Sequence, residues 1–254
     1  MLYTIGNLFA LINNKLTKKY VDPYNPLGLP ANTVRVRTSD GQAPIKVTTG
    51  STQTTYETAT LVPGTNDVYD VYKSGDSFKR LLYKSTNVTE VLGANTTGIT
   101  HMGWMFYYCS SLTSVPLFDT SSVTYMAGMF THCQITTVPL YDTSSCTNTA
   151  TMFSGCEYLT TAPLFNTSLC TDMSAMFSMC GSLTAVPLYD TSSCTNMAMM
   201  FMGCKKVESG ALALYRQASS QAVPPSTYYS CFEACGSDTQ TGSAELAQIP
   251  DDWK

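Results

Sequence analysis

The chain has 254 residues, of which 44% are apolar and 13% charged, and its formal net charge is −4. This content of apolar residues supports a folded core and excludes a largely disordered chain. No Lys or Arg occurs between Lys84 and Lys205, so this stretch has no cation to neutralise phosphates and nucleic-acid binding there is excluded. No apolar run approaches the roughly 18–20 residues that a spanning helix needs, so we expect no membrane span.

The first 20 residues predict an N-terminal helix, because their apolar positions follow helical spacing. These positions are Ile5, Leu8, Phe9, Ile12 and Leu16. Two interpretations stay open: the helix packs on its own domain, or it docks the chain on other proteins of a larger assembly. The segment has no basic stretch before its apolar part and no small-residue cleavage site. It is therefore a poor secretory signal.

A small antiparallel β domain is predicted for residues 31–80, after a Pro-rich linker at 21–30. Its expected strands alternate with turn-forming residues and lie at 33–38, 45–49, 55–62 and 67–73. The β domain either stands alone or covers the apolar open end of the region that begins near residue 81.

Residues 81–207 repeat a unit of about 24 residues. The complete units contain a Met-Phe pair, a Cys three residues later, a Pro-Leu pair and an Asp-Thr-Ser or Asn-Thr-Ser triplet, whereas the first unit, which begins near Leu81, is degenerate and the last is atypical. The aligned phenylalanines are Phe106, Phe130, Phe153, Phe177 and Phe201. Such a period is the signature of a solenoid whose stacked turns share one core. We therefore predict an α+β repeat solenoid of about seven leucine-rich-repeat-like turns. Residues 208–254 are expected to form its C-terminal cap, with an insertion helix and a last partial repeat.

Inside one unit, Met126, Met129, Phe130 and Cys133 have the spacing of one face of a short α-helix or 3₁₀ segment. Leu140 is expected to point inward with them from a short extended segment. The Asp-Thr-Ser triplets predict polar turns whose side chains bond backbone N–H groups.

The ten cysteines fall mostly into two aligned positions, one of which also holds Val123 and Ile99. A position that accepts Val, Ile and Cys is apolar. Equivalent atoms of stacked strands lie about 5 Å apart, farther than the Cβ atoms of a disulfide. Free, buried thiols are the favoured interpretation, and they suit folding in a reducing cytoplasm. A disulfide between Cys231 and Cys235 and a zinc site are the alternatives.

The repeated M-F-x-x-C-x-x-L-T-x-V-P-L-F-D-T-S-x-V-T-x-M unit resembles the BspA-like branch of leucine-rich repeats. It is most similar to the domain of unknown function first noted in mycoplasma surface proteins. The resemblance covers residues 81–254, and the tail at 207–254 looks like the C-terminal cap of versions encoded by gut bacteria and their bacteriophages. It implies a right-handed repeat coil used for adhesion or recognition, without catalysis. Surface members of the family usually carry an export signal, whereas the N-terminal segment of this sequence is a poor one. This sequence is therefore more similar to a phage structural or fibre component.

We expect a non-enzymatic bacteriophage virion protein, a head or tail fibre or decoration component, that displays its repeats for adhesion or host and glycan recognition. Tyr107, Tyr108, His132 and Tyr158 stand at variable positions between Phe and Leu. They are candidate contacts with a protein or glycan on a host surface, or simply surface residues. Other virion proteins would bind the N-terminal region, within a homo-oligomer or larger assembly. The alternatives are a bacterial cell-surface adhesin of the BspA-like type and a purely structural capsid or fibre-joining protein.

No catalytic, cofactor-binding or metal-binding residue is predicted. His101 occupies an ordinary repeat position, shared with Tyr125, Asn148, Asp172 and Asn196. Aspartates of the triplets are expected turn residues: Asp119, Asp142 and Asp190. A calcium ladder along them is the alternative, although Asn166 interrupts it. No phosphate-binding Gly loop is present.

Overall fold

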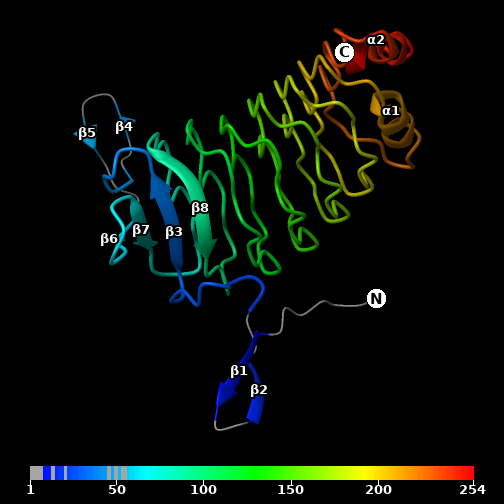
Figure 1. Cartoon of the computed structure of the whole chain (residues 1–254). Coiled ribbons are helices and arrows are strands. Elements are labelled where there is room, and N and C mark those ends of the chain that lie inside the picture. The colour runs from blue at the N-terminus through cyan, green and yellow to red at the C-terminus, as the bar shows by residue number, and fades with distance from the viewer. Residues whose placement is uncertain (1–7, 13–14, 20–21, 45–46, 49–50, 53–55) are drawn as a thin grey trace.

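The computed structural model describes residues 8–12, 15–19, 22–44, 47–48, 51–52 and 56–254. The strands are β1 (Leu8–Ile12), β2 (Lys15–Lys19), β3 (Thr33–Thr38), β4 (Val47–Thr48), β5 (Ser51–Thr52), β6 (Thr58–Leu61), β7 (Val68–Tyr72) and β8 (Val88–Ala94). The helices are α1 (Ala211–Ser219), α2 (Gln240–Leu246) and the 3₁₀ helix η1 (Asp251–Trp253). Figure 1 shows the sheet that contains β3 and β8 at one end of the repeat region, and α1 and α2 at the other. None of the helices in these ranges is long and apolar enough to cross a membrane.

An antiparallel sheet with the strand order β6-β7-β3-β8 precedes the repeats. Strands predicted at 33–38, 55–62 and 67–73 are found as β3, β6 and β7. In β3, Val34 and Val36 are fully buried on one face, as period-two alternation requires. The fourth strand, β8, lies beyond the expected end of the β domain at residue 80 and joins this sheet to the repeats.

β8 makes that connection through both of its edges. It pairs antiparallel with β3 on one side. On the other side the Val91 amide donates to the Ser114 carbonyl at 3.2 Å, and a parallel bridge joins Glu90 to Ser114. The last strand of the sheet, which lies within residues 81–207, is therefore also paired with the repeat unit that follows it.

The predicted fold class, an α+β repeat solenoid of about seven turns with an N-terminal helix, is wrong. Regular secondary structure in the described residues is a four-stranded antiparallel sheet, two two-stranded pairs, two short helices and one 3₁₀ helix. No solenoid of seven α+β repeats is formed: no helix or strand is assigned between β8 and α1, where isolated parallel bridges join neighbouring segments.

The N-terminal helix is replaced by β1 and β2, which pair antiparallel. Leu8, Phe9 and Ile12 lie in β1 and Leu16 lies in β2, whereas Ile5 lies outside the described residues. The reason for the error is that a short apolar run fits a strand as well as a helix.

Backbone conformation explains why the Met-Phe segments are not helical. Gly128 and His132 have φ of 65° and 57°, and the equivalent residues of the other units are also left-handed. A left-handed residue ends an α-helix. The predicted helical face from Met126 to Cys133 is therefore a series of tight turns, in which the Met129 amide donates to the Met126 carbonyl at 3.2 Å.

The amides of alternate residues in these turns bond to the next unit. Gly128 donates to Ala150 at 2.8 Å, and Phe130 donates to Met152 at 2.9 Å. Single parallel bridges join the aligned residues His101, Tyr125, Asn148, Asp172, Asn196 and Thr227 in succession. Figure 1 shows the corresponding segments as loops lying side by side. Because the pairing is made one residue at a time, it holds neighbouring units together without producing named strands.

The core between the units is a row of stacked phenylalanine rings, here called the phenylalanine row: Phe106, Phe130, Phe153, Phe177 and Phe201. Their centroids are 5.4–5.6 Å apart with nearly parallel planes. The prediction that Leu140 points inward is wrong, because it is 65% exposed. The adjacent Tyr141 is buried in its place and donates from its hydroxyl to the Pro116 carbonyl at 3.1 Å.

The prediction of polar turns at the Asp-Thr-Ser triplets is confirmed. Oδ1 of Asp142 accepts from the Ser144 amide at 3.0 Å and from its hydroxyl at 2.7 Å. Thr143 is buried and donates to the Asn166 carbonyl of the next unit at 2.8 Å. Each triplet thus closes its own turn and also connects it to a neighbour.

All ten cysteines are buried with free thiols. At the position three residues after the aligned phenylalanine, the thiol donates to a carbonyl of the preceding unit: Cys133 to Phe106 and Cys156 to Phe130, both at 3.1 Å. That bond gives Cys a role which an aliphatic side chain of the same size cannot take. Burial raises the pKa of Cys156 to about 12, so these thiols stay protonated at neutral pH.

Candidate functional site

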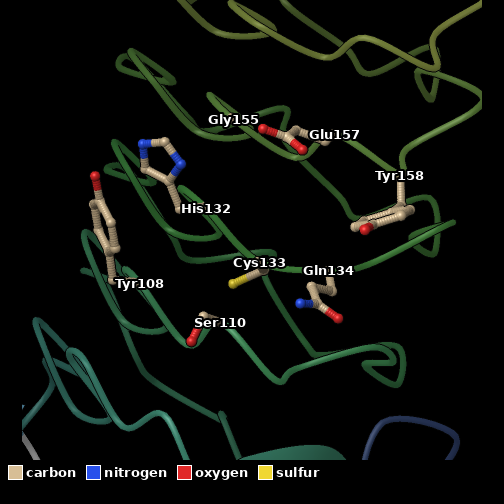
Figure 2. Close-up of a pocket in the computed structure, with 8 residues that line it drawn as sticks. All are labelled: Tyr108, Ser110, His132, Cys133, Gln134, Gly155, Glu157 and Tyr158. Carbon is tan, nitrogen blue, oxygen red and sulfur yellow. The ribbon is translucent and has the colours of Figure 1, made fainter.

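Three of the four predicted surface residues meet in one hollow, here called the tyrosine–histidine hollow. It has a volume of about 250 Å³ and is lined by Tyr108, Ser110, His132, Cys133, Gln134, Gly155, Glu157 and Tyr158. Figure 2 shows Tyr108 and His132 on one side of it and Glu157 and Tyr158 on the other. The hollow therefore spans three successive units.

Tyr107 does not line the hollow. Its ring is half-buried and stacks on Tyr83, with centroids 4.9 Å apart. It also lies 4.7 Å from the ring of Tyr108. Tyr107 therefore supports the wall of the hollow and does not face its interior.

Left-handed backbone turns position the rings of Tyr108 and His132 at the hollow. Tyr108 and His132 both have φ of 57°, and their amides donate at 2.8 Å to the carbonyls of Thr131 and Ser154 in the next unit. Their rings consequently lie side by side, with centroids 4.2 Å apart. Left-handed backbone costs a non-glycine residue about 1–2 kcal/mol, and the regular bonds to the next unit offset that cost.

The sequence interpretation missed Ser110, Gln134, Glu157 and Gly155, and of these Gly155 shapes the hollow most directly. It has φ of 71°, and a Cβ added there would lie 2.3 Å from Nδ1 of His132. The imidazole ring therefore occupies space that only a glycine leaves open. The available signal was that Gly155 aligns with Tyr108 and His132, whose side chains are large.

The remaining wall of the hollow is mostly polar. Ser110, Gln134, Glu157 and Tyr158 are exposed, and Tyr158 has 54% of its surface accessible. These groups offer a hydroxyl, an amide and a carboxylate beside an aromatic face. Such a set suits a ligand that has both hydroxyl groups and an apolar face.

Cys133 is the buried part of the lining. Only 2% of its surface is exposed, and its thiol donates to the Phe106 carbonyl at 3.1 Å. Burial is the main cause that raises the pKa of Cys133 well above its usual value, and the neighbouring Cys109 and Cys156 raise it further. Because the thiolate is the reactive form, this thiol is a poor nucleophile.

His101, the second histidine, lies outside the hollow. Its ring stacks on Tyr125 at 4.5 Å, and its Nδ1 accepts from the Gly103 amide at 3.1 Å. Burial and then the charge of Lys79 lower the pKa of His101. Within the described ranges, no group of three or more His, Cys, Asp or Glu residues is arranged to hold a metal ion.

Comparison with known proteins identifies the repeats. Residues 76–180 and 160–218 match the family described as "Mycoplasma protein of unknown function, DUF285". These ranges together cover more than half of the chain. The chain belongs to the DUF285 family. No curated protein and no solved structure matches it. Membership supports the resemblance to BspA-like repeats, and the family description assigns no function.

Proposed function

We propose that this DUF285 chain is a non-enzymatic recognition protein of a bacteriophage virion that binds host carbohydrate in the tyrosine–histidine hollow. The observation that carries the proposal is the meeting of Tyr108, His132 and Tyr158 around one exposed hollow. Its volume of about 250 Å³ lies below the range typical of drug-sized ligands and suits a single sugar ring.

Carbohydrate fits this lining better than an apolar ligand does. The C–H face of a sugar can pack on an exposed tyrosine ring, as amphipathic aromatic side chains do at interfaces. Its hydroxyl groups can bond to Ser110, Gln134 and Glu157, which line the same hollow. A wholly apolar ligand would leave these groups without partners and would lose their hydration.

The residue types of the hollow support binding without catalysis. The thiol of Cys133 is buried and is held protonated by a raised pKa. A nucleophile would instead need an exposed position and a lowered pKa.

A glycan array tests the proposal with the full chain. We expect binding to particular glycans, with at least about tenfold loss in the variants Tyr108→Ala and Tyr158→Ala, because stacked aromatic residues dominate such contacts. Tyr229→Ala is the matched control, since Tyr229 is 55% exposed and does not line the hollow. Absence of glycan binding, or equal loss in the control variant, would contradict the proposal.

The virion setting is supported by the likeness of the C-terminal segment to caps encoded by gut bacteriophages. Fractionation separates it from the alternative of a bacterial surface adhesin. Mass spectrometry should detect the chain in purified virions. Its detection in the outer membrane of uninfected cells, and not in virions, would favour the adhesin.

One observation favours a structural role as a second candidate. Leu140, Leu164 and Leu188 occupy equivalent positions and are 65%, 62% and 57% exposed. Aligned exposed leucines are unusual on a monomer and would be buried if two copies packed together. Analytical ultracentrifugation should then show a dimer that Leu164→Ser weakens, and a monomer at all concentrations would remove this candidate.

A further inference from the structure

A cluster of cations and aromatic rings lies at the start of the repeats, here called the basic–aromatic patch. It consists of Lys79, Arg80, Tyr83, Lys84 and Trp104. The Arg80 guanidinium carbon lies 5.2 Å from the ring centroid of Tyr83 and 5.6 Å from that of Trp104. Lys79 Nζ is 5.6 Å from Trp104, and Lys84 Nζ is 5.5 Å from Tyr83. The rings therefore gather three positive charges in one place.

These three cations have no carboxylate partner in the part of the chain that the structure describes. The ion pairs found there join Arg35 to Asp70, Arg37 to Asp67 and Glu90, and Lys254 to Asp251. Lys79 and Arg80 are exposed and Lys84 is half-buried. Packing on a ring face uses none of the N–H donors of a cation, so these donors are available to an anionic ligand.

The basic–aromatic patch and the tyrosine–histidine hollow are continuous. Lys84, Tyr108 and His132 occupy the same position of successive units, and all three are left-handed. Lys84 Nζ lies 6.0 Å from the ring of Tyr108, which lies 4.2 Å from that of His132. Successive units are spaced by about 5 Å, so Lys84 stands one unit away from the Tyr108 side of the hollow.

We propose that the basic–aromatic patch and the hollow form one site for an acidic polysaccharide. The carboxylate or sulfate group of one sugar would bind Lys79, Arg80 and Lys84, while the next sugar occupies the hollow. This inference rests on the proposed function and adds the ligand class and its orientation.

The distribution of charge fixes the orientation and argues against a nucleic acid. Figure 2 shows Glu157 across the hollow from Tyr108, and Lys84 Nζ of the patch lies 6.0 Å from the Tyr108 ring. The acidic group is therefore attracted to the patch and repelled from the far side. No Lys or Arg occurs between Lys84 and Lys205. A single-stranded nucleic acid carries a phosphate at every nucleotide and needs a cationic groove along its length. One cluster of cations suits a ligand whose charges are sparse.

Fluorescence titration of the full chain tests this inference, because Trp104 belongs to the patch and reports on its occupation. The probes are a galacturonic acid tetrasaccharide, its neutral methyl ester, chondroitin sulfate and unsulfated chondroitin. Comparison of the first pair measures carboxylate recognition, and comparison of the second measures the contribution of sulfate. A thymidine oligonucleotide of similar charge is the nucleic-acid probe.

The decisive variant replaces Lys79, Arg80 and Lys84 together with Gln. We expect it to bind the preferred acidic glycan at least about tenfold more weakly, because it removes the charge-assisted contacts. Lys205→Gln with Lys206→Gln is the matched control, since both lysines are exposed and distant in sequence. The control should retain binding within about twofold.

Several results would overturn the inference. The neutral ester could bind as well as the acid, the Lys205 and Lys206 control could lose as much affinity as the patch variant, or the oligonucleotide could bind more tightly than any glycan. Binding of neutral glycans that depends on Tyr108 and not on the three cations would overturn this inference alone and leave the proposed function standing. Failure of every glycan to bind would overturn both.

Discussion

Replacing Phe153 with Ala tests how the repeat units are held together. Phe153 is fully buried, and its ring centroid lies 5.6 Å from Phe130 and 5.4 Å from Phe177. Truncation of a buried Phe to Ala costs about 3–5 kcal/mol. Each stacked aromatic pair contributes about 0.5–1.5 kcal/mol beyond the area that it buries. We therefore expect Phe153→Ala to lower the free energy of unfolding by about 3–5 kcal/mol.

Urea denaturation at equilibrium measures this loss. The chain has two tryptophans, Trp104 and Trp253. Trp104 lies at the start of the repeats, and Trp253 stacks at 6.3 Å on Phe232, which itself stacks on Phe201 at the end of the phenylalanine row. Their fluorescence thus reports on both ends of the repeats. Since the units contact mainly their neighbours, removal of a central ring should also separate the unfolding of the two ends into two transitions.

Leu164→Ala is the control, because Leu164 belongs to the same repeated motif but is 62% exposed. Its expected effect is below about 0.5 kcal/mol. If the two variants lost similar stability, or if Phe153→Ala cost less than about 1 kcal/mol, the phenylalanine row would not be the main source of cohesion.

Burial raises the pKa of Cys146 to about 12 from 9.0, so the unfolded chain ionises first. The contribution of this thiol to the free energy of unfolding is present below about pH 9 and is lost as pH rises toward 12. Urea titrations of Cys146→Val should therefore show a smaller loss of stability in alkali, by up to about 1.4 kcal/mol per pH unit. Hydrogen bonds from the Ser144 hydroxyl and amide lower the pKa of Asp142 from 3.8, so its contribution is present above about pH 4 and lost in acid. Asp142→Ala should lower the free energy of unfolding by about 1 kcal/mol at neutral pH and by less in acid, whereas Asp142→Asn should retain most of the stability of the turn. Equal loss in both variants would show that the carboxylate charge matters more than its shape. Gly155→Ala places a methyl group against His132, so thermal melts should show a loss of about 1–2 kcal/mol. Gly155→Ala should also lower the affinity for glycan, and an unchanged affinity would remove His132 from the site.

The repeated motif was sufficient to predict which aligned residues share an environment. Phe153, Cys156 and their equivalents are buried at matching places, because side chains that recur at a fixed period must meet the same neighbours. Tyr108, His132 and Tyr158 were also predicted from the sequence as candidate contacts, since they vary where the core residues do not, and that role stays a prediction. Their meeting in one hollow required coordinates.

Hydrophobicity gave a wrong prediction where the orientation of neighbouring side chains could not be read from the sequence. Leu140 and Tyr141 are adjacent and both apolar, yet 65% of the leucine is exposed and 2% of the tyrosine. A single residue of offset decides which of two neighbours points inward. A different ambiguity explains the N-terminal error: a short apolar run fits a strand as well as a helix, and residues 8–12 and 15–19 form β1 and β2.

The sequence by itself determined the period of the repeats, their buried Phe and Cys positions and the polar turns at the triplets, because these follow from local chemistry. Only the tertiary structure decided the left-handed conformation of the residues that flank each aligned phenylalanine. Trp104, Thr151 and Met199 adopt it at one such position, although none of these residue types favours it. Their amides bond to the following unit, and that contact between residues distant in sequence outweighs the local backbone preference.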